Sequence, residues 1–219
     1  MIRVRFTTLT SVKAEIGTDK STDDTDFTKY IDSASDLIAH SLNRNFVPTY
    51  DTWRYRREAM VNAVTLELDR DLLDITTLYQ PSGGTIAATD YQLLPLNESA
   101  KYRIELTQEG GQIFNFPSRS GTVTIVGWWG YHDDYARAWS ATDSLQGTLA
   151  ASGTVMKVAD VSVFQIGDYT RISNSGTVEA MRITGATAGS LVVQRGELGT
   201  TAVTWGSLVT VDRYQHVRQ

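Results

Sequence analysis

The side chains best suited to binding a metal are a group of aspartates near the N-terminus. Asp19, Asp23, Asp24 and Asp26 lie close together in the sequence. An oxygen-rich loop can bind calcium, but an EF-hand loop that starts at Asp19 requires glycine at its sixth position and glutamate at its twelfth, where this chain has Asp24 and Tyr30. Because carboxylates at the start of a helix interact favourably with the helix dipole, we interpret these aspartates as part of a helix N-terminus.

The three histidines are His40, His132 and His216. His132 precedes Asp133 and Asp134, which is the strongest local grouping of metal-ligand types in the chain. Adjacent residues on a loop point in different directions, so a site there would need further ligands from elsewhere. We therefore predict no metal site and no cofactor.

Carboxylates are frequent in the middle of the chain, on or between predicted strands: Glu67, Asp69, Asp71, Asp74, Glu98, Glu105 and Glu109. Spacing along a chain does not identify an acid–base pair, because such a pair is defined by its separation in space and its perturbed pKa values. The sequence contains no G-x-S-x-G, G-x-x-x-x-G-K-[ST], G-x-G-x-x-G or H-E-x-x-H motif and no cysteine. We predict that the chain is not an enzyme. An alternative interpretation is a hydrolase that uses one of these carboxylates to cleave a cell-wall polymer.

Aromatic residues indicate a binding surface. Trp128 and Trp129 are adjacent, so they face opposite sides of a regular strand, and at least one is expected to leave the domain core. Trp and Tyr dominate interface hot spots, and we take Trp128, Trp129 and Tyr131 as exposed candidates. The alternative, in which both tryptophans are covered by the following connector or by a second β module, remains open.

Composition limits the functional classes. The chain has 219 residues, of which 41% are hydrophobic, with a net charge of −5 and no cysteine. The negative charge repels nucleic acid and anionic membranes, and lack of cysteine fits a reducing cytoplasm. No apolar run has the length of a signal peptide or a membrane span, so we expect neither export nor membrane insertion.

Two helices are expected at the N-terminus. The first starts at Thr8 or Thr10 and ends at Gly17; the second, capped by Ser21 or Thr22, ends before Pro48. The second helix has an apolar stripe at three- and four-residue steps, which must pack against a partner surface. The stripe comprises Phe27, Tyr30, Ile31, Ala34, Leu37, Ile38 and Ser41.

The rest of the chain alternates apolar and polar residues, which predicts strands. The first series is 52–56, 64–68, 72–79, 91–94, 102–106, 113–116 and 123–129; after a connector at 131–144, the second series is 148–150, 155–158, 169–172, 180–184, 190–194 and 208–211. A shift to Gly, Thr, Ser, Ala and Val marks a module boundary near Ser144. We predict an α+β fold: a small helical bundle (1–50), an antiparallel β region (51–143), a small β-barrel-like module (144–212) and a C-terminal tail (213–219).

Several stretches carry a family resemblance: Phe6–Gly17, Ala34–Ile38 with Asn43–Phe46, Gly121–Tyr131, Ile166–Tyr169 and Val193–Ala202. The first three resemble parts of the head–tail adaptor (connector) proteins of tailed bacteriophages, and the last two are similar to a β module of long phage connector and tail-associated proteins. The resemblance implies a non-enzymatic ring, typically of twelve subunits, at the head–tail junction of the virion, made in the host cytoplasm. Its partners would be the portal protein, tail-side virion proteins and other copies of the chain, with double-stranded DNA passing through the channel without specific binding.

The resemblance also implies roles for residues. The second helix would pack within the ring through Phe27, Tyr30, Ile31, Ala34, Leu37 and Ile38. Related sequences often continue into a further helix, and the last residues here resemble the start of one. We expect this segment to contact the portal or tail as an extended tail: Arg213, Tyr214, Gln215, His216, Val217, Arg218 and Gln219.

The rival interpretation is a carbohydrate-binding or host-attachment module of the virion. In that case the two β regions and their exposed tryptophans stack on sugar rings. The rival predicts a monomer or trimer with affinity for glycans, whereas the adaptor interpretation predicts a large ring.

Overall fold

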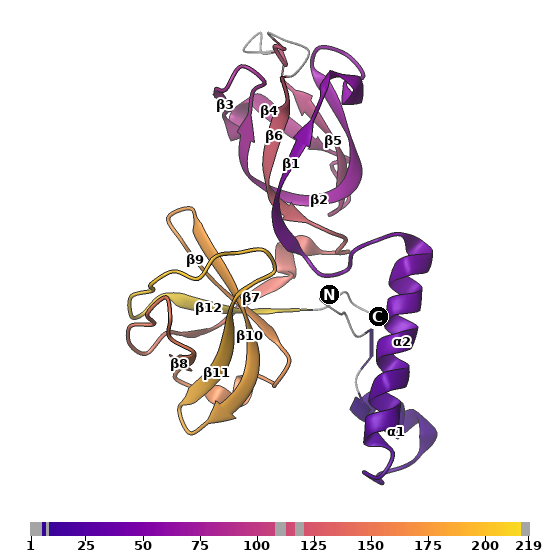
Figure 1. Ribbon diagram of the computed structural model, residues 1–219, viewed down its shortest axis with the longest axis vertical. Helices are drawn as coiled ribbons and strands as arrows, with labels where there is room; N and C mark the ends of the chain where they lie inside the picture. Colours follow the sequence, from indigo (N-terminus) through magenta and orange to yellow (C-terminus); the bar gives the residue numbers. More distant parts are fainter. Residues whose placement is uncertain (1–5, 8, 108–112, 117–120, 216–219) are drawn as a thin grey trace. The chain divides into compact units, whose positions relative to one another are not determined.

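The computed structural model describes residues 6–7, 9–107, 113–116 and 121–215. The protein is α+β, with two α-helices and two antiparallel sheets among these residues (Figure 1). It divides into two compact units, a helical unit at residues 1–47 and a β unit at residues 48–219. The predicted helix and sheet content is therefore confirmed at the level of fold class.

The helical unit contains α1 (Leu9–Ile16) and α2 (Asp24–Leu42). As expected, Gly17 follows α1 with a φ of +73°, a conformation that glycine adopts without steric cost. Asn43 ends α2 in the left-handed region, and its backbone N–H bonds to the His40 carbonyl oxygen. The expected cap at Ser21 or Thr22 is wrong: Asp23 precedes the first helical residue, and its side chain makes no capping hydrogen bond. Thr8, one of the two starts expected for the first helix, lies outside the described residues.

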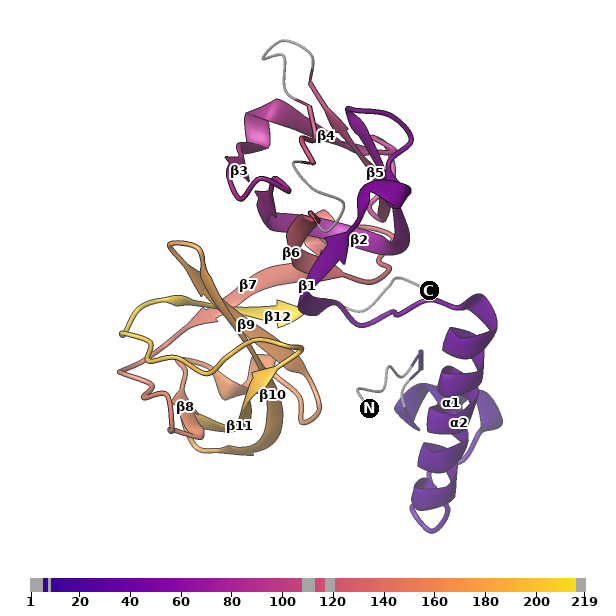
Figure 2. The same cartoon turned by 45° about the horizontal axis from the view of Figure 1, so that its top comes forward.

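The first sheet of the β unit contains six strands: β1 (Thr49–Tyr55), β2 (Thr65–Tyr79), β3 (Thr85–Ile86), β4 (Tyr91–Leu94), β5 (Lys101–Leu106) and β6 (Val123–Trp129). Their order is β1-β6-β2-β5-β4, with β3 paired to β2. The two strands expected at 64–68 and 72–79 are one long strand, because β2 continues through a register shift between Glu67 and Leu72. Its first half pairs with β5 and its second with β6, so it bends across the sheet (Figures 1 and 2). The strand expected at 113–116 is absent.

The second sheet also has six strands: β7 (Trp139–Ser144), β8 (Val155–Lys157), β9 (Tyr169–Asn174), β10 (Thr177–Thr187), β11 (Ser190–Glu197) and β12 (Thr210–Tyr214). Their order is β7-β12-β9-β10-β11-β8. This sheet begins before and ends after the expected range 144–212, because the presumed connector contains β7 and the presumed tail contributes Arg213 and Tyr214 to β12. The strand expected at 148–150 is only an isolated bridge, between Leu149 and Trp205.

Short 3-10 helices complete the described structure, at Arg57–Ala59, Ala88–Asp90, Tyr135–Arg137 and Val161–Val163. Each sheet covers its own apolar core. The first core includes Leu66, Leu72 and Ile104, and the second includes Met156, Ile172 and Met181; all six are fully buried. In the described part of the chain neither sheet forms a closed barrel. The two halves of the β unit are thus stabilised by separate hydrophobic cores.

Candidate assembly surface

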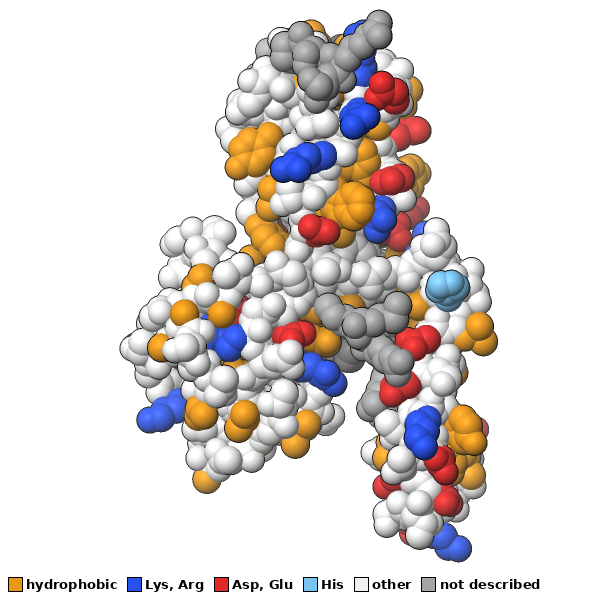
Figure 3. Space-filling view, in the orientation of Figure 1, with side chains coloured by type: hydrophobic (Ala, Val, Ile, Leu, Met, Phe, Trp, Pro, Cys, Tyr) orange, Lys and Arg blue, Asp and Glu red, His pale blue; other side chains and the backbone are white. Residues whose placement is uncertain are grey.

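Among the described residues, the most extensive exposed apolar surface on a helix lies along α2. Tyr30 and Leu37 are 70% and 67% exposed, and Ile38 and Leu42 are also exposed. Together with Ala34 these residues recur at three- and four-residue steps, so they share one face of the helix. We call this set the α2 stripe. Figure 3 shows hydrophobic side chains on the visible surface of the helical unit.

The opposite face of α2 provides the small interior of the helical unit. Ile31 and Ser35 are its buried residues, and the Ser35 hydroxyl accepts a hydrogen bond from the backbone N–H of Phe6 at 3.2 Å. The Phe6 ring packs edge-on against Phe46, with 4.9 Å between ring centroids. Because α1 contains no buried residue, it does not cover all the apolar side chains of α2.

The predicted packing residues thus fall into two groups. Ile31 is buried and Phe27 half-buried within the unit, while Tyr30, Ala34, Leu37 and Ile38 remain exposed. Apolar side chains repeating along one exposed helix face are typical of a surface that packs against another protein segment.

The C-terminal segment differs from the expected extended tail. Arg213 and Tyr214 belong to β12, the Arg213 Nη1 atom donates to the Val163 carbonyl oxygen at 2.5 Å, and Tyr214 is buried. The Gln215 amide donates to Ser140 Oγ at 3.0 Å. The expected extended tail is therefore wrong for Arg213 and Tyr214, which lie in β12, and Gln215 is held by its hydrogen bond to Ser140. The contact of this segment with the portal or tail stays a prediction. His216, Val217, Arg218 and Gln219 lie outside the described residues.

The aromatic candidates are covered. Trp128 and Trp129 face opposite sides of β6, as expected, but both are buried, so the prediction of an exposed tryptophan is wrong. Trp129 packs in the first core beside Tyr55, and its indole N–H donates to the Asp51 carbonyl oxygen at 3.2 Å. Trp128 instead packs against Trp139 of the second sheet, with 5.8 Å between ring centroids. The open alternative, coverage by the connector and second β module, is what the structure shows for Trp128.

Tyr131, the third aromatic candidate, is half-buried. The aromatic contacts continue past it through the junction of the two sheets. Trp139 lies 5.1 Å from Tyr214, and Tyr214 lies 5.8 Å from His132, measured between ring centroids. These aromatic residues therefore join the two halves of the β unit.

His132 is a structural residue. Its ring is buried, Nδ1 accepts from the backbone N–H of Asp134 at 3.0 Å, and Nε2 lies 2.9 Å from the Gln215 carbonyl oxygen. These partners assign the neutral tautomer with the proton on Nε2. Across the described ranges, no group of three or more His, Cys, Asp or Glu side chains could hold a metal ion. The helices within those ranges are also too short or too polar to cross a membrane.

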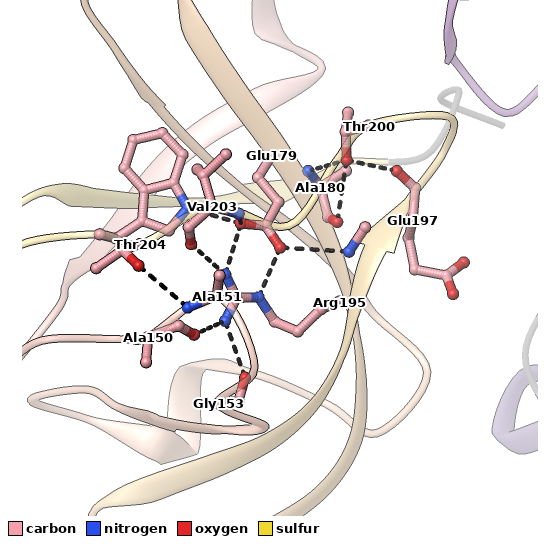
Figure 4. Close-up of polar contacts among 12 residues, drawn as sticks. Ala150, Ala151, Gly153, Glu179, Ala180, Arg195, Glu197, Thr200, Val203 and Thr204 are labelled. Atoms are coloured by element: carbon pink, nitrogen blue, oxygen red, sulfur yellow. Dashed lines mark hydrogen bonds and ion pairs between the residues drawn. The ribbon is translucent and has the colours of Figure 1, made fainter.

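The most extensive buried polar network lies in the second sheet and was not predicted from the sequence (Figure 4). The Glu179 side chain is fully buried, and the Arg195 side chain is 7% exposed. Arg195 donates from Nε and Nη2 to the two carboxylate oxygens at 2.6 and 2.7 Å. The carboxylate also accepts from Trp205 Nε1 at 2.8 Å and from the Val203 N–H at 3.1 Å.

Arg195 holds the surrounding loops as well. Its Nη1 donates to the carbonyl oxygens of Ala150 and Gly153, and its Nη2 donates to that of Val203. Burial of Glu179 opposes ionisation, but the hydrogen bonds from Arg195, Trp205 and Val203 outweigh it, and the carboxyl pKa is lowered. An ionised carboxylate whose acceptor positions are filled cannot act as a base, so this network stabilises the fold.

Comparison with known proteins gave no assignment: neither the family models nor the curated proteins nor the solved structures match this chain.

Proposed function

We propose that this chain is a structural virion protein, a head–tail adaptor that forms a ring, of twelve subunits by family resemblance, between the portal and the tail. The role is non-enzymatic: the ring extends the channel through which DNA leaves the capsid. The observation that carries the proposal is the α2 stripe, because its apolar residues lack cover in the part of the chain that the structure describes.

The size of the stripe suits assembly on a template. Tyr30, Leu37, Ile38 and Leu42 are 70%, 67%, 43% and 57% exposed, so covering them would contribute about 1 kcal/mol apiece. Association costs about 4 kcal/mol or more in lost translational and rotational freedom. The stripe alone therefore supports only weak association in solution, and a portal that arrays the subunits would supply the remaining free energy.

The net charge is compatible with a DNA channel. A surface with a net charge of −5 does not retain phosphates, so the duplex could slide past it. In this proposal the two helices contribute to a bundle that neighbouring subunits complete. The second sheet acts as a barrel-like module, supported by the Leu145–Val158 bridge between the segments that follow its two edge strands.

The test is to image the tagged chain in assembled phage particles. The proposal expects density for a ring beneath the capsid vertex that contains the portal. Its absence from the junction between capsid and tail would refute the proposal.

Substitutions in α2 provide a quantitative test of the same proposal. Leu37→Glu places a charge in the α2 stripe, and Ser33→Glu places the same charge on an exposed position outside it. Both variants should keep the melting temperature of the β unit. Only Leu37→Glu should reduce the amount of chain incorporated per particle, measured by quantitative mass spectrometry; equal incorporation would exclude the stripe as an assembly surface.

The carbohydrate-binding interpretation was based on exposed tryptophans. Trp128 and Trp129 are buried, so that signal does not support it.

A further inference from the structure

A polar cleft lies at the junction of the two sheets in the β unit. Its volume is about 550 Å³. Its wall combines side chains from both sheets and from the loop between β4 and β5, among them Asp74 of β2, Lys101 of β5, Tyr135, Trp139 of β7 and Arg171 of β9. The cleft thus collects acidic, basic and aromatic groups that are far apart in the sequence.

Two charged groups of opposite sign line this cleft without pairing with each other. Arg171 bonds through Nε and Nη2 to Asp212, at 3.1 and 2.8 Å, which leaves Nη1 without a partner among the described residues. Asp74 forms no ion pair within the same part of the chain, but a hydrogen bond from the Ile75 backbone N–H and the nearby charge of Arg171 both lower its pKa. Partial burial is the larger effect and raises the pKa of Asp74.

Two polar groups lie buried in the wall of the cleft, the Tyr135 hydroxyl and the Trp139 indole N–H. The indole N–H lies close enough to the hydroxyl to lower the pKa of Tyr135, although burial is the larger effect and raises it. Trp139 is nine-tenths buried, and its ring is covered by the Arg171 guanidinium, 4.7 Å from the ring centroid.

Lys101 is already engaged. Its ammonium donates to the Pro95 carbonyl oxygen at 2.6 Å and also to those of Leu96 and Glu98, so it fixes the loop that forms one wall. A second contact fixes the opposite end of the loop, because the Tyr135 backbone N–H donates to Ser99 Oγ at 3.0 Å. The groups of the cleft that remain available to a ligand are therefore the Asp74 carboxylate as an acceptor and Arg171 Nη1 as a donor.

We propose that this cleft binds a saccharide. A sugar hydroxyl both donates and accepts, so neighbouring hydroxyls can donate to Asp74 and accept from Arg171 Nη1 at the same time. Leu73 and the aromatic edges of Tyr135 and Trp139 provide apolar contact for the carbon face of the ring. The site is independent of the α2 stripe, so it does not rest on the adaptor proposal.

The test uses the purified full chain and a panel of neutral sugars: glucose, galactose, N-acetylglucosamine and their short oligomers. Saturation-transfer NMR and tryptophan fluorescence should detect saturable binding of at least one of them. Asp74→Asn and Arg171→Lys should each weaken that binding at least about tenfold, because each loses a hydrogen bond that involves a charged group.

Matched controls keep the result interpretable. Glu105→Gln removes a carboxylate from β5, and Arg182→Gln removes an exposed arginine from β10; neither lines the cleft. Both should bind sugar like the wild type. Melting temperatures of all variants confirm folding, and Asp74→Ala provides a second truncation that leaves the Arg171–Asp212 pair intact.

Three results would overturn the proposal. The first is that the wild type binds no sugar of the panel at millimolar concentration. The second is that Asp74→Asn, Asp74→Ala and Arg171→Lys bind the sugar with unchanged affinity, which would place the binding elsewhere. Saturable binding of glycine or alanine in place of sugars would show that the cleft recognises an ammonium and a carboxylate.

Discussion

Replacing Arg195 by methionine should destabilise the β unit strongly. The substitution leaves the Glu179 carboxylate fully buried without its cation and leaves the carbonyl oxygens of Ala150, Gly153 and Val203 without this donor. Removal of one partner from a buried ion pair costs about 3–5 kcal/mol. The lost carbonyl contacts place the expected value at the upper end of that range.

The assay is thermal unfolding of the full chain, followed by circular dichroism and calorimetry. For 150–250 residues, each kcal/mol shifts the melting temperature by about 2–4 °C, so a cost of about 5 kcal/mol for Arg195→Met should lower it by roughly 10–20 °C. Arg182→Met is the matched control, because Arg182 is an exposed arginine on the adjacent β10 strand. A surface change of this kind usually stays within about 0.5 kcal/mol.

Arg195→Lys separates charge from geometry. Lysine keeps the positive charge but cannot donate to both carboxylate oxygens and three carbonyl groups from one planar fork, so its stability should lie between wild type and Arg195→Met. Equal melting temperatures for Arg195→Met and Arg182→Met would refute the argument that this ion pair holds the second sheet together.

Three further outcomes follow from the structure. Gly199→Ala should destabilise the β unit, because Gly199 has a φ of +83° and a Cβ there would overlap the Tyr50 carbonyl oxygen. Gly189 has a φ of +74° but open space around it, so Gly189→Ala should lower the free energy of unfolding, measured by denaturant titration, by less. Glu179 has a lowered pKa, so its contribution should be complete above the ordinary glutamate value of 4.5 and be lost as the pH falls through the folded-state pKa; a flat acid limb in wild-type melting curves would contradict this. Asp74 has a raised pKa, so its charged form disfavours folding. Asp74→Asn should melt above the wild type at pH 7, with the difference vanishing below the ordinary Asp pKa of 3.8, and a constant difference across pH would exclude this cause.

The spacing of apolar residues predicted most of the helices and strands, because this pattern depends only on residues that are close together in the sequence. The strand expected at 91–94 coincides with β4, and that at 123–129 coincides with β6. The strand at 139–144 was missed because its alternation is weak and it follows a polar turn. The fate of Trp128 could not be predicted either, since β7 supplies the side chain that covers it.

The candidate sites depend even more on distant residues. A glutamate at position 179 within a strand gives no local sign that Arg195 and Trp205 will satisfy it. Asp74 and Arg171 likewise meet only because two sheets pack together. The apolar stripe of α2 could be found from the sequence, but which of its residues α1 covers could not, because that depends on the packing of two helices.

The two units differ in how completely each buries its apolar side chains and pairs its buried polar groups. Each sheet of the β unit has a core of fully buried residues, and the buried charge of Glu179 is fully hydrogen-bonded. The helical unit buries Ile31 but leaves Tyr30 and Leu37 on its surface. Because the stripe contributes little to the stability of the single chain, substitutions there should change assembly without changing folding. The proposed assembly surface thus lies on α2, where assembly can be tested separately from folding.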